Sequence, residues 1–377
     1  MKIGIITFYN GINYGGTLQC LATQSVLQEL GHEVLIINYK VTKRRGFLKK
    51  NLDRLVSVSS FNDIKAIIEG ICKKKKKGSC ALNPEEIKYV RKSFDEFRQK
   101  HFNETTLVNE DTIANVANGL DCIIIGSDQI WADIHEATPV YIGGWAPRYN
   151  GRLIAYAACS PLLKIERPYK KRTTELLKRF HGISTRDTHT KRVIPDSCNV
   201  ESKVVVDPTM LYNGWNIPAE RLIEEKYILL YILRREISGG VKEAIRLIKE
   251  KYPNRKVVSI LTGETSIKRG FEGVDEFIIP TPEEWVQLIA QSDVLFTDSF
   301  HGSVFASKYS KPFISYYNEN SEGKYRLIEL QNILNAKNNF VRNIEELKTS
   351  LEKGIEYKMQ EIEQIKDSKN WLINKLS

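Results

Sequence analysis

Short apolar runs alternate with segments of helical periodicity from the beginning of the chain. Residues 3–8 form an apolar run typical of a buried parallel strand, and residues 34–39 form a second one. Between them, apolar residues from Leu18 to Leu30 recur at the spacing of a helix face, and Gly31 is a helix stop signal. The three segments predict a strand–helix–strand unit, the first part of a doubly wound parallel sheet.

This alternation continues to about residue 207 and begins again at residue 227. Residues 211–225 contain Gly214 and Pro218 and interrupt the pattern in the manner of a linker. We therefore expect an α/β protein with two Rossmann-like, doubly wound domains that face each other across a cleft. The expected boundaries are residues 1–212 for the first domain, with a basic insertion at about 40–80, residues 213–353 for the second, and residues 354–377 for a C-terminal helix that can pack back on the first domain.

The individual elements follow from the same pattern. Further strands are expected at residues 122–126, 153–158, 182–187, 204–207, 227–233, 256–261, 294–297 and 312–316. Helices are expected at residues 84–101, 169–180, 240–251, 282–291, 302–309, 325–334 and 344–351.

Composition narrows the class of protein. The chain has 377 residues, 42% hydrophobic and 27% charged, which is typical of a soluble protein with more than one domain. Its six cysteines contain no CxxC pair, so we expect neither a zinc site nor a disulfide framework. No apolar run reaches the ~20 residues of a membrane span, and the N-terminus lacks a signal-peptide core. A cytoplasmic location is expected.

The net charge of +10 is unevenly distributed, because much of it lies between Lys40 and Lys77. This insertion is either a solvated basic segment or a surface attracted to anionic lipid, which contributes about 1 kcal/mol per basic residue near a membrane. In the second case, neutralising residues 73–77 should weaken binding to anionic vesicles. The basic segments are not interleaved with aromatic residues, and the sequence contains no recognised nucleic-acid-binding motif. Nucleic acid is therefore not expected as a partner.

Ligands on open α/β sheets bind at the carboxyl ends of the strands. Four segments with suitable side chains follow expected strands: residues 10–16, 126–129, 186–187 and 298–302. The glycines of the first segment fit neither a P-loop nor GxGxxG, so it is either a tight turn or a ligand loop presenting Asn10 and Asn13. Asp128 either caps the next segment or accepts a proton from a sugar hydroxyl.

Arg186 and His301 are candidates for binding an anion. Arg186 either pairs with an acid such as Asp187 or forks a carboxylate or phosphate. His301 is either structural or, because it precedes Gly302 and a helix start, holds an anion there. With Lys308, Lys311 and Lys324, the two residues would make a cleft for a small, highly charged anion. No glycosidase carboxylate pair, GxSxG or HExxH motif is present, and a metal site is not expected.

Five stretches resemble the polysaccharide pyruvyl transferase family in order and spacing, from Lys2 to about Leu334. They read GIITFYNGINYGGTLQCLATQSVLQELGHEVLIINY, DCIIIGSDQIW, ISTRD, VVVDPTMLY and DVLFTDSFHGSVFASKYSKPFI. The resemblance implies a fold like that of GT-B glycosyltransferases, with the acceptor on the first domain and the donor on the second. It also implies transfer of the enolpyruvyl unit of phosphoenolpyruvate onto two sugar hydroxyls, giving a pyruvate ketal and phosphate without a further cofactor.

The resemblance also implies roles for single residues. An arginine at the position of Arg186 and the histidine at His301 bind the donor in such enzymes. Relatives often read RLHG where this chain has Ser299 to Gly302, which removes one positive charge unless a nearby lysine replaces it. We expect catalysis by His301 and Asp128, donor binding by Arg186, His301, Gly302, Ser299, Lys308, Lys311 and Lys324, and acceptor binding by Asn10, Asn13, Tyr14, Asp128 and Gln129.

The expected partners are phosphoenolpyruvate and a glycan acceptor, which can be lipid-linked and would bring the protein to the inner face of the membrane. Two other functions fit the sequence. One is a GT-B glycosyltransferase that uses a nucleotide sugar, and the other is a non-catalytic glycan-binding or assembly protein.

Overall fold

The structure is a computed structural model that describes residues 1–42, 81–134, 136, 139–145, 149–194, 196, 200–233, 236–263, 265–319 and 323–377. Residues 43–80, which hold most of the expected basic insertion, lie outside this part of the chain. No helix of the described part is long and apolar enough to cross a membrane.

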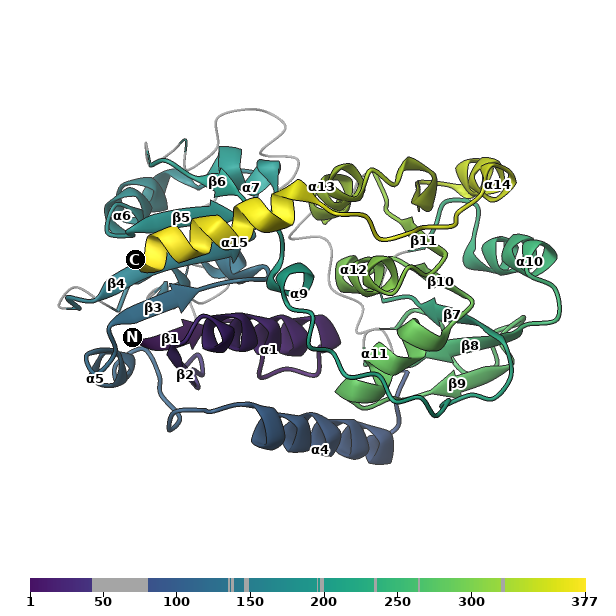
Figure 1. The fold of residues 1–377 in the computed structure, drawn as a ribbon, viewed down its shortest axis with the longest axis horizontal. Helices are drawn as coiled ribbons and strands as arrows, with labels where there is room; N and C mark the ends of the chain where they lie inside the picture. The colour runs from purple at the N-terminus through teal and green to yellow at the C-terminus, as the bar shows by residue number, and fades with distance from the viewer. Residues whose placement is uncertain are drawn as a thin grey trace.

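Two six-stranded sheets, each with all its strands parallel, form two α/β lobes that lie side by side (Figure 1). The first sheet has the order β2-β1-β3-β4-β5-β6 and the second β12-β11-β10-β7-β8-β9. This confirms the prediction of two Rossmann-like domains. The strands of the first sheet are β1 (Lys2–Ile6), β2 (Glu33–Ile36), β3 (Cys122–Ile125), β4 (Arg152–Ala158), β5 (Gly182–Thr185) and β6 (Lys203–Val204). Those of the second are β7 (Tyr227–Tyr231), β8 (Lys256–Ile260), β9 (Glu276–Ile278), β10 (Val294–Thr297), β11 (Phe313–Tyr316) and β12 (Phe340–Val341).

Helices cover both faces of each sheet, so the central strands are buried along their whole length. β3, β7 and β10 have no exposed residue, which is the continuous apolar pattern of a parallel strand. The helices of the first domain are α1 (Tyr14–Glu29), α4 (Pro84–His101), α5 (Ile113–Ala117), α6 (Arg167–Leu177), α7 (Thr188–Val193) and α9 (Pro208–Leu211). The second domain has α10 (Val241–Lys251), α11 (Pro282–Gln291), α12 (Phe300–Lys308), α13 (Lys324–Leu334) and α14 (Ile344–Lys353).

The C-terminal helix α15 (Glu363–Leu376) returns from the second domain and lies against the first sheet (Figure 1). The hydroxyl of Ser368 accepts a hydrogen bond from the backbone N–H of Val206 at 3.0 Å. The ring of Trp371 packs against Tyr156, with ring centroids 6.2 Å apart. This last element therefore joins the two domains a second time.

Two helix starts are set by capping side chains that the periodic pattern does not show. Helix α1 begins at Tyr14, because the side chain of Asn13 accepts a hydrogen bond from Gly16 N and acts as its N-cap. Helix α12 begins at Phe300 rather than at residue 302, because Ser299 caps it in the same way. Helix α13 begins one residue earlier than expected, and the short strands β9 and β12 are too brief to give a periodic signal.

Aromatic packing fixes the boundary between the domains. Tyr14, in the first turn of α1, stacks on Trp285 of α11 with ring planes 9° apart. Its hydroxyl donates a hydrogen bond to the carbonyl oxygen of Pro280 at 2.6 Å. The first turn of α1 is thus held against the second domain beside the carboxyl edges of both sheets.

Candidate active site

Three charged side chains from both domains meet at the carboxyl edges of the two sheets. Arg186 follows β5 directly, and its Nη1 donates a hydrogen bond to Oδ2 of Asp207 at 2.9 Å. His301, in the first turn of α12, places Nε2 at 3.6 Å from the same oxygen. Only 2% of Arg186, 1% of Asp207 and 6% of His301 is exposed. The cluster is therefore a buried charge centre shared by the domains.

A second carboxylate and a hydroxyl complete the cluster. Nη2 of Arg186 contacts Oδ1 of Asp128 at 3.4 Å, which is long for a charged hydrogen bond. The hydroxyl of Ser127 donates to Oδ2 of Asp207 at 2.9 Å. Strands β1 and β3 are neighbours in the first sheet. The loop that leads from β1 into α1 and the loop that carries Asp128 after β3 therefore start side by side.

The imidazole of His301 is packed against the backbone of Gly15. A Cβ atom at position 15 would lie 2.1 Å from Nδ1 of His301, far inside van der Waals contact. Only glycine therefore allows this close approach between α1 and α12. On the other side of the site, the ring of Phe300 lies under the guanidinium of Arg186, with 4.5 Å between the ring centroid and Cζ.

The charges of the cluster stabilise one another. Burial opposes ionisation of Asp207, but the charges of His301 and Arg186 hold the pKa of this carboxyl well below its usual range. Although burial alone would lower the pKa of Arg186, the groups around it, Cys159 and the carboxylates of Asp207 and Asp128, raise that pKa above its ordinary value. Arg186, Asp207 and their ion pair therefore stay charged at neutral pH.

Two nitrogen atoms in this centre have no hydrogen-bond partner among the described residues. They are Nε of Arg186 and Nε2 of His301, and both are buried. Leaving such a polar atom unpaired costs about 1–3 kcal/mol. A bound molecule with anionic oxygens would satisfy both atoms at once.

The start of α12 is already capped by its own chain. The hydroxyl oxygen of Ser299 accepts a hydrogen bond from Gly302 N at 3.2 Å, and Ser299 N donates to Oγ1 of Thr297 at 3.0 Å. The Gly302 amide, which we expected to bind the donor, is therefore occupied in this structure. Ser299 is the N-cap of α12. It stands at the position where similar sequences often have arginine, but it adds no positive charge to the site.

The three lysines do not gather around His301. Lys308 and Lys311 follow the far end of α12, which runs back to the amino edge of the sheet, and Lys308 bonds the Met210 carbonyl and Asn213 instead. Lys324 lies nearer the carboxyl edge, but its ammonium is paired with Glu319. The positive charge of the site comes from Arg186 and His301.

The expected acceptor residues occupy different environments. Asn13 is exposed and caps α1 through its Oδ1, whereas the side chain of Tyr14 is buried and bonds the second domain, so Tyr14 is closed to a ligand. Gln129 is half-buried at the start of a 3-10 turn (Ile130–Asp133). Asn10 is exposed and donates to Oδ1 of Asn38 at 3.2 Å. Among these residues, Asn10 lines a cavity between the domains.

Asp207 is the site residue that the sequence reasoning missed. One of the two interpretations of Arg186 paired it with an acid such as Asp187, but Asp187 caps α7 by accepting from Thr190 N at 2.7 Å, and the acid beside Arg186 is Asp207. Asp207 was interpreted only as the end of a strand before Pro208. The available signal was its position after an apolar run, the same signal that identified Asp128.

The cluster can bind an anion and move a proton. A fixed guanidinium suits a carboxylate or phosphate, and an imidazole held by a carboxylate can act as a general acid. Among the described residues, no group of three or more His, Cys, Asp or Glu side chains could hold a metal ion.

Solved structures with a similar fold have very different sequences. A protein from Listeria monocytogenes, described as a UDP-N-acetylglucosamine 2-epimerase, aligns with a TM-score of 0.53 and 11% identity, covering 98% of this chain and 90% of that chain. The UDP-GlcNAc 2-epimerase from Methanocaldococcus jannaschii aligns with a TM-score of 0.52 and 12% identity, covering 100% and 99%. These likenesses confirm the GT-B-like fold and carry no information on the reaction.

No curated protein sequence matches the chain. A family model described as polysaccharide pyruvyl transferase matches residues 13–320, which include the whole charge centre and most of both domains. The chain therefore belongs to the polysaccharide pyruvyl transferase family.

Proposed function

We propose that the protein transfers the enolpyruvyl group of phosphoenolpyruvate onto two hydroxyls of a sugar, forming a pyruvate ketal and releasing phosphate. The acceptor would be a surface polysaccharide or its lipid-linked precursor, modified in the cytoplasm at the inner face of the membrane. The observation that carries the proposal is the buried charge centre, in which Nε of Arg186 has no hydrogen-bond partner among the described residues and Nε2 of His301 has only the long, 3.6 Å contact with Asp207.

Phosphoenolpyruvate has the two anionic groups that this centre could hold. Nε and Nη2 of Arg186 form one edge of the guanidinium, and a carboxylate can bind such an edge through two parallel hydrogen bonds. The contact of Nη2 with Asp128 is long, at 3.4 Å, so it is the contact that a donor carboxylate would replace. The phosphate would then face the imidazole of His301.

The reaction needs an acid and an orienting base. Protonation of the methylene carbon of phosphoenolpyruvate makes C2 cationic, and the oxygen of one sugar hydroxyl bonds to C2 and loses its proton. The second hydroxyl then bonds to C2 while the bond from C2 to the phosphate oxygen breaks, and phosphate leaves with the electron pair. The proton lost by the first hydroxyl replaces the proton that the acid gave to the methylene carbon. The proton lost by the second hydroxyl leaves with the phosphate.

In this scheme His301 is the general acid and also faces the departing phosphate. Asp207 touches Arg186 and His301 and acts as a positioning residue, since its carboxylate orients both cations. Asp128, once displaced from Arg186, can accept a hydrogen bond from a sugar hydroxyl.

The test is incubation with phosphoenolpyruvate and a glycan acceptor, with free phosphate and the mass of the product as readouts. We expect phosphate release and a product heavier by one pyruvate ketal. His301→Gln and Arg186→Lys should each lower the rate by about 10²-fold, as for loss of a preorganised charged contact. His32→Gln, at the amino edge of the first sheet, is the matched control, and circular dichroism would verify that each variant is folded.

Other outcomes distinguish the alternatives. Release of a nucleotide from a nucleotide sugar, with no phosphate from phosphoenolpyruvate, would make the protein a glycosyltransferase. Glycan binding that survives His301→Gln and Arg186→Lys unchanged, without turnover of either donor, would make it a non-catalytic protein.

A further inference from the structure

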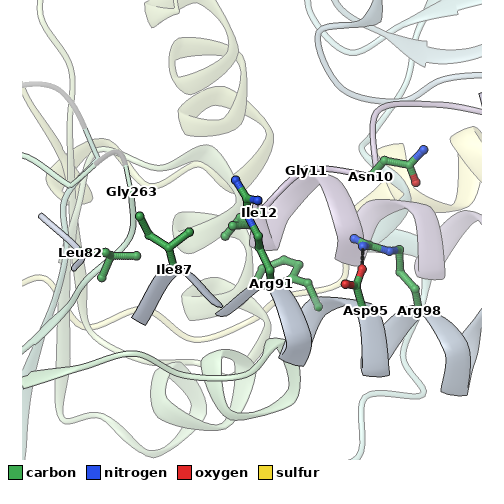
Figure 2. A pocket seen from close by; sticks show the side chains of 10 residues that line it. Asn10, Gly11, Ile12, Leu82, Ile87, Arg91, Asp95, Arg98 and Gly263 are labelled. Atoms are coloured by element: carbon green, nitrogen blue, oxygen red, sulfur yellow. Dashed lines mark hydrogen bonds and ion pairs between the residues drawn. The ribbon is translucent and has the colours of Figure 1, made fainter. Parts of the chain in front are cut away.

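A cavity of about 630 Å³ lies between the loop that precedes α1, the helix α4 and the loop after β8 (Figure 2). Its walls combine residues of the first domain with Gly263 of the second, so it opens at the domain boundary. A volume of this size suits a small ligand or one to two sugar residues of a longer one. The lining residues are Asn10, Gly11, Ile12, Leu82, Ile87, Arg91, Phe94, Asp95, Arg98 and Gly263.

Two arginines of α4 give the cavity a positive charge. Arg98 pairs with Asp95, and the dashed line in Figure 2 marks this contact. Arg91 is exposed and makes no ion pair with any described residue. In Figure 2 its guanidinium extends from α4 toward the loop that holds Ile12. One arginine is thus uncompensated in a partly enclosed space.

Arg98 adds an unsatisfied donor to this charge. Its Nη1 is buried and has no hydrogen-bond partner among the described residues, although Nη2 is bound to Asp95. Only 17% of the Arg98 side chain is exposed, so solvent does not easily satisfy this atom. An anionic oxygen inside the cavity could accept from the exposed guanidinium of Arg91, with the charge of Arg98 on the same wall.

A residue that lines the cavity is close in sequence to a residue that contacts the charge centre. Ile12 lines it, and Gly15, three residues later, packs against His301. Three consecutive Cα–Cα steps span at most about 11 Å, which bounds the distance between these two residues. The cavity therefore adjoins the turn of chain that contacts His301.

The remaining walls suit a sugar chain. Ile12 and Ile87 are partly exposed and offer apolar surface, against which the carbon face of a sugar ring can pack. The side chain of Asn10 is fixed by its hydrogen bond to Asn38 and supplies a polar group on the rim. The lining therefore combines an apolar floor with one fixed amide, two guanidinium groups and the carboxylate of Asp95, which is paired with Arg98.

We propose that this cavity is an acceptor subsite that binds an anionic group, a carboxylate or a phosphate, through Arg91 and Arg98. The acceptor of the transferase is then an acidic glycan, and the charged group lies one or two sugars from the hydroxyls that receive pyruvate. That the bound molecule is the acceptor rests on the proposed function. That the cavity binds an anion is inferred from the cavity and its arginines alone.

The experiment measures binding and turnover separately. Binding of a disaccharide with a terminal glucuronate, of its methyl ester and of a sugar phosphate is titrated calorimetrically against the full chain. We expect at least one charged ligand to bind about tenfold more tightly than the ester, and Arg91→Gln to abolish that difference. The control is Lys92→Gln, the next residue of α4, whose 72% exposed side chain lies outside the cavity lining.

The two charged ligands identify the source of the anion, a uronate or a phosphorylated sugar. Inorganic phosphate is the third probe, and binding as tight as that of the sugar phosphate would mean an adventitious ion only and overturn the proposal. An equal loss of acid and ester affinity in Arg91→Gln would also overturn it.

Turnover distinguishes this proposal from the proposed function. With phosphoenolpyruvate as donor, Arg91→Gln should raise KM for the acidic acceptor about tenfold and leave kcat unchanged. Absence of turnover together with Arg91-dependent binding would sink the transferase proposal and keep the anion site. Turnover with a KM that does not change in Arg91→Gln would support the transferase proposal and overturn the anion site.

Discussion

His301 Nε2 lies 3.6 Å from Oδ2 of Asp207, although the two residues belong to different domains. The same oxygen accepts the 2.9 Å hydrogen bond from Arg186. One fully buried carboxylate therefore contacts a nitrogen-bearing side chain from each domain. The geometry of the centre consequently depends on how the domains pack.

Asp207→Asn should destabilise the protein and disturb the centre. Removing one partner of a buried ion pair leaves Arg186 undercompensated, which typically costs about 3–5 kcal/mol of the free energy of unfolding. Urea unfolding at neutral pH measures this loss. Asp367→Asn breaks only the exposed pair with Lys203, 3.9 Å long, and should cost less than about 1 kcal/mol.

The pH dependence of the same variant has a definite sign. The pKa of Asp207 is held below its usual value of 3.8, so its contribution to stability is present above about pH 4 and is lost as the pH falls below that value. The difference in unfolding free energy between wild type and Asp207→Asn should therefore shrink between pH 5 and about pH 3. A difference that stays constant over this range would contradict the assignment.

Lys308 should give a second rise of stability with pH, in the alkaline range. Burial lowers the pKa of Lys308 from 10.5 to about 8, so the unfolded chain binds more protons than the folded one between these values. Stability should rise through this window, by on the order of 2 kcal/mol from this group. Lys308→Met should remove that rise in unfolding experiments at pH 7.5 to 10, whereas Lys369→Met, on an exposed position of α15, should keep it.

The packing of helix α15 on the first domain should contribute to the stability of the protein. Leu372 is 2% exposed against the first domain, whereas its neighbour Ile373 is 36% exposed. Leu372→Ala should cost about 2–5 kcal/mol, since it removes buried methyl groups and leaves a cavity. Ile373→Ala should cost well under 1 kcal/mol in the same urea titration, and equal losses would mean that α15 does not pack as described.

The alternating pattern identified most of the fold because parallel strands are apolar along their whole length. The strands that contain Ile123, Leu229 and Phe296 were therefore evident in the sequence. The pattern also placed Arg186 and His301 at the carboxyl edges of the sheets, since both follow an apolar run. Positions of this kind depend on local sequence and topology alone.

Side-chain partners could not be predicted in the same way. Tyr14 packs on Trp285, which is far away in sequence, and no local signal separates this packing from ligand contact. Asp207 pairs with Arg186 because β5 and β6 are neighbours in the sheet, which the order of strands along the chain does not fix. Lys308 could have been placed correctly, because a helix that follows a parallel strand returns to the amino edge.

Gly15 offers the most direct test of the contact between α1 and His301. In Gly15→Ala the new Cβ would lie 2.1 Å from Nδ1 of His301, so the imidazole must leave its present position beside Asp207. Alanine is a better helix former than glycine, and the helix itself should not suffer. We expect the rate of phosphate release to fall by about 10²-fold, the cost of displacing a catalytic group by about 1 Å. Gly119→Ala is the matched control, because its Cβ would meet only the Val116 carbonyl oxygen at 3.6 Å, an ordinary contact. Because the new methyl group overpacks a buried contact, urea unfolding should show a loss of about 1–3 kcal/mol in Gly15→Ala and almost none in Gly119→Ala. A rate of phosphate release that survives Gly15→Ala would contradict the role of His301 in the reaction.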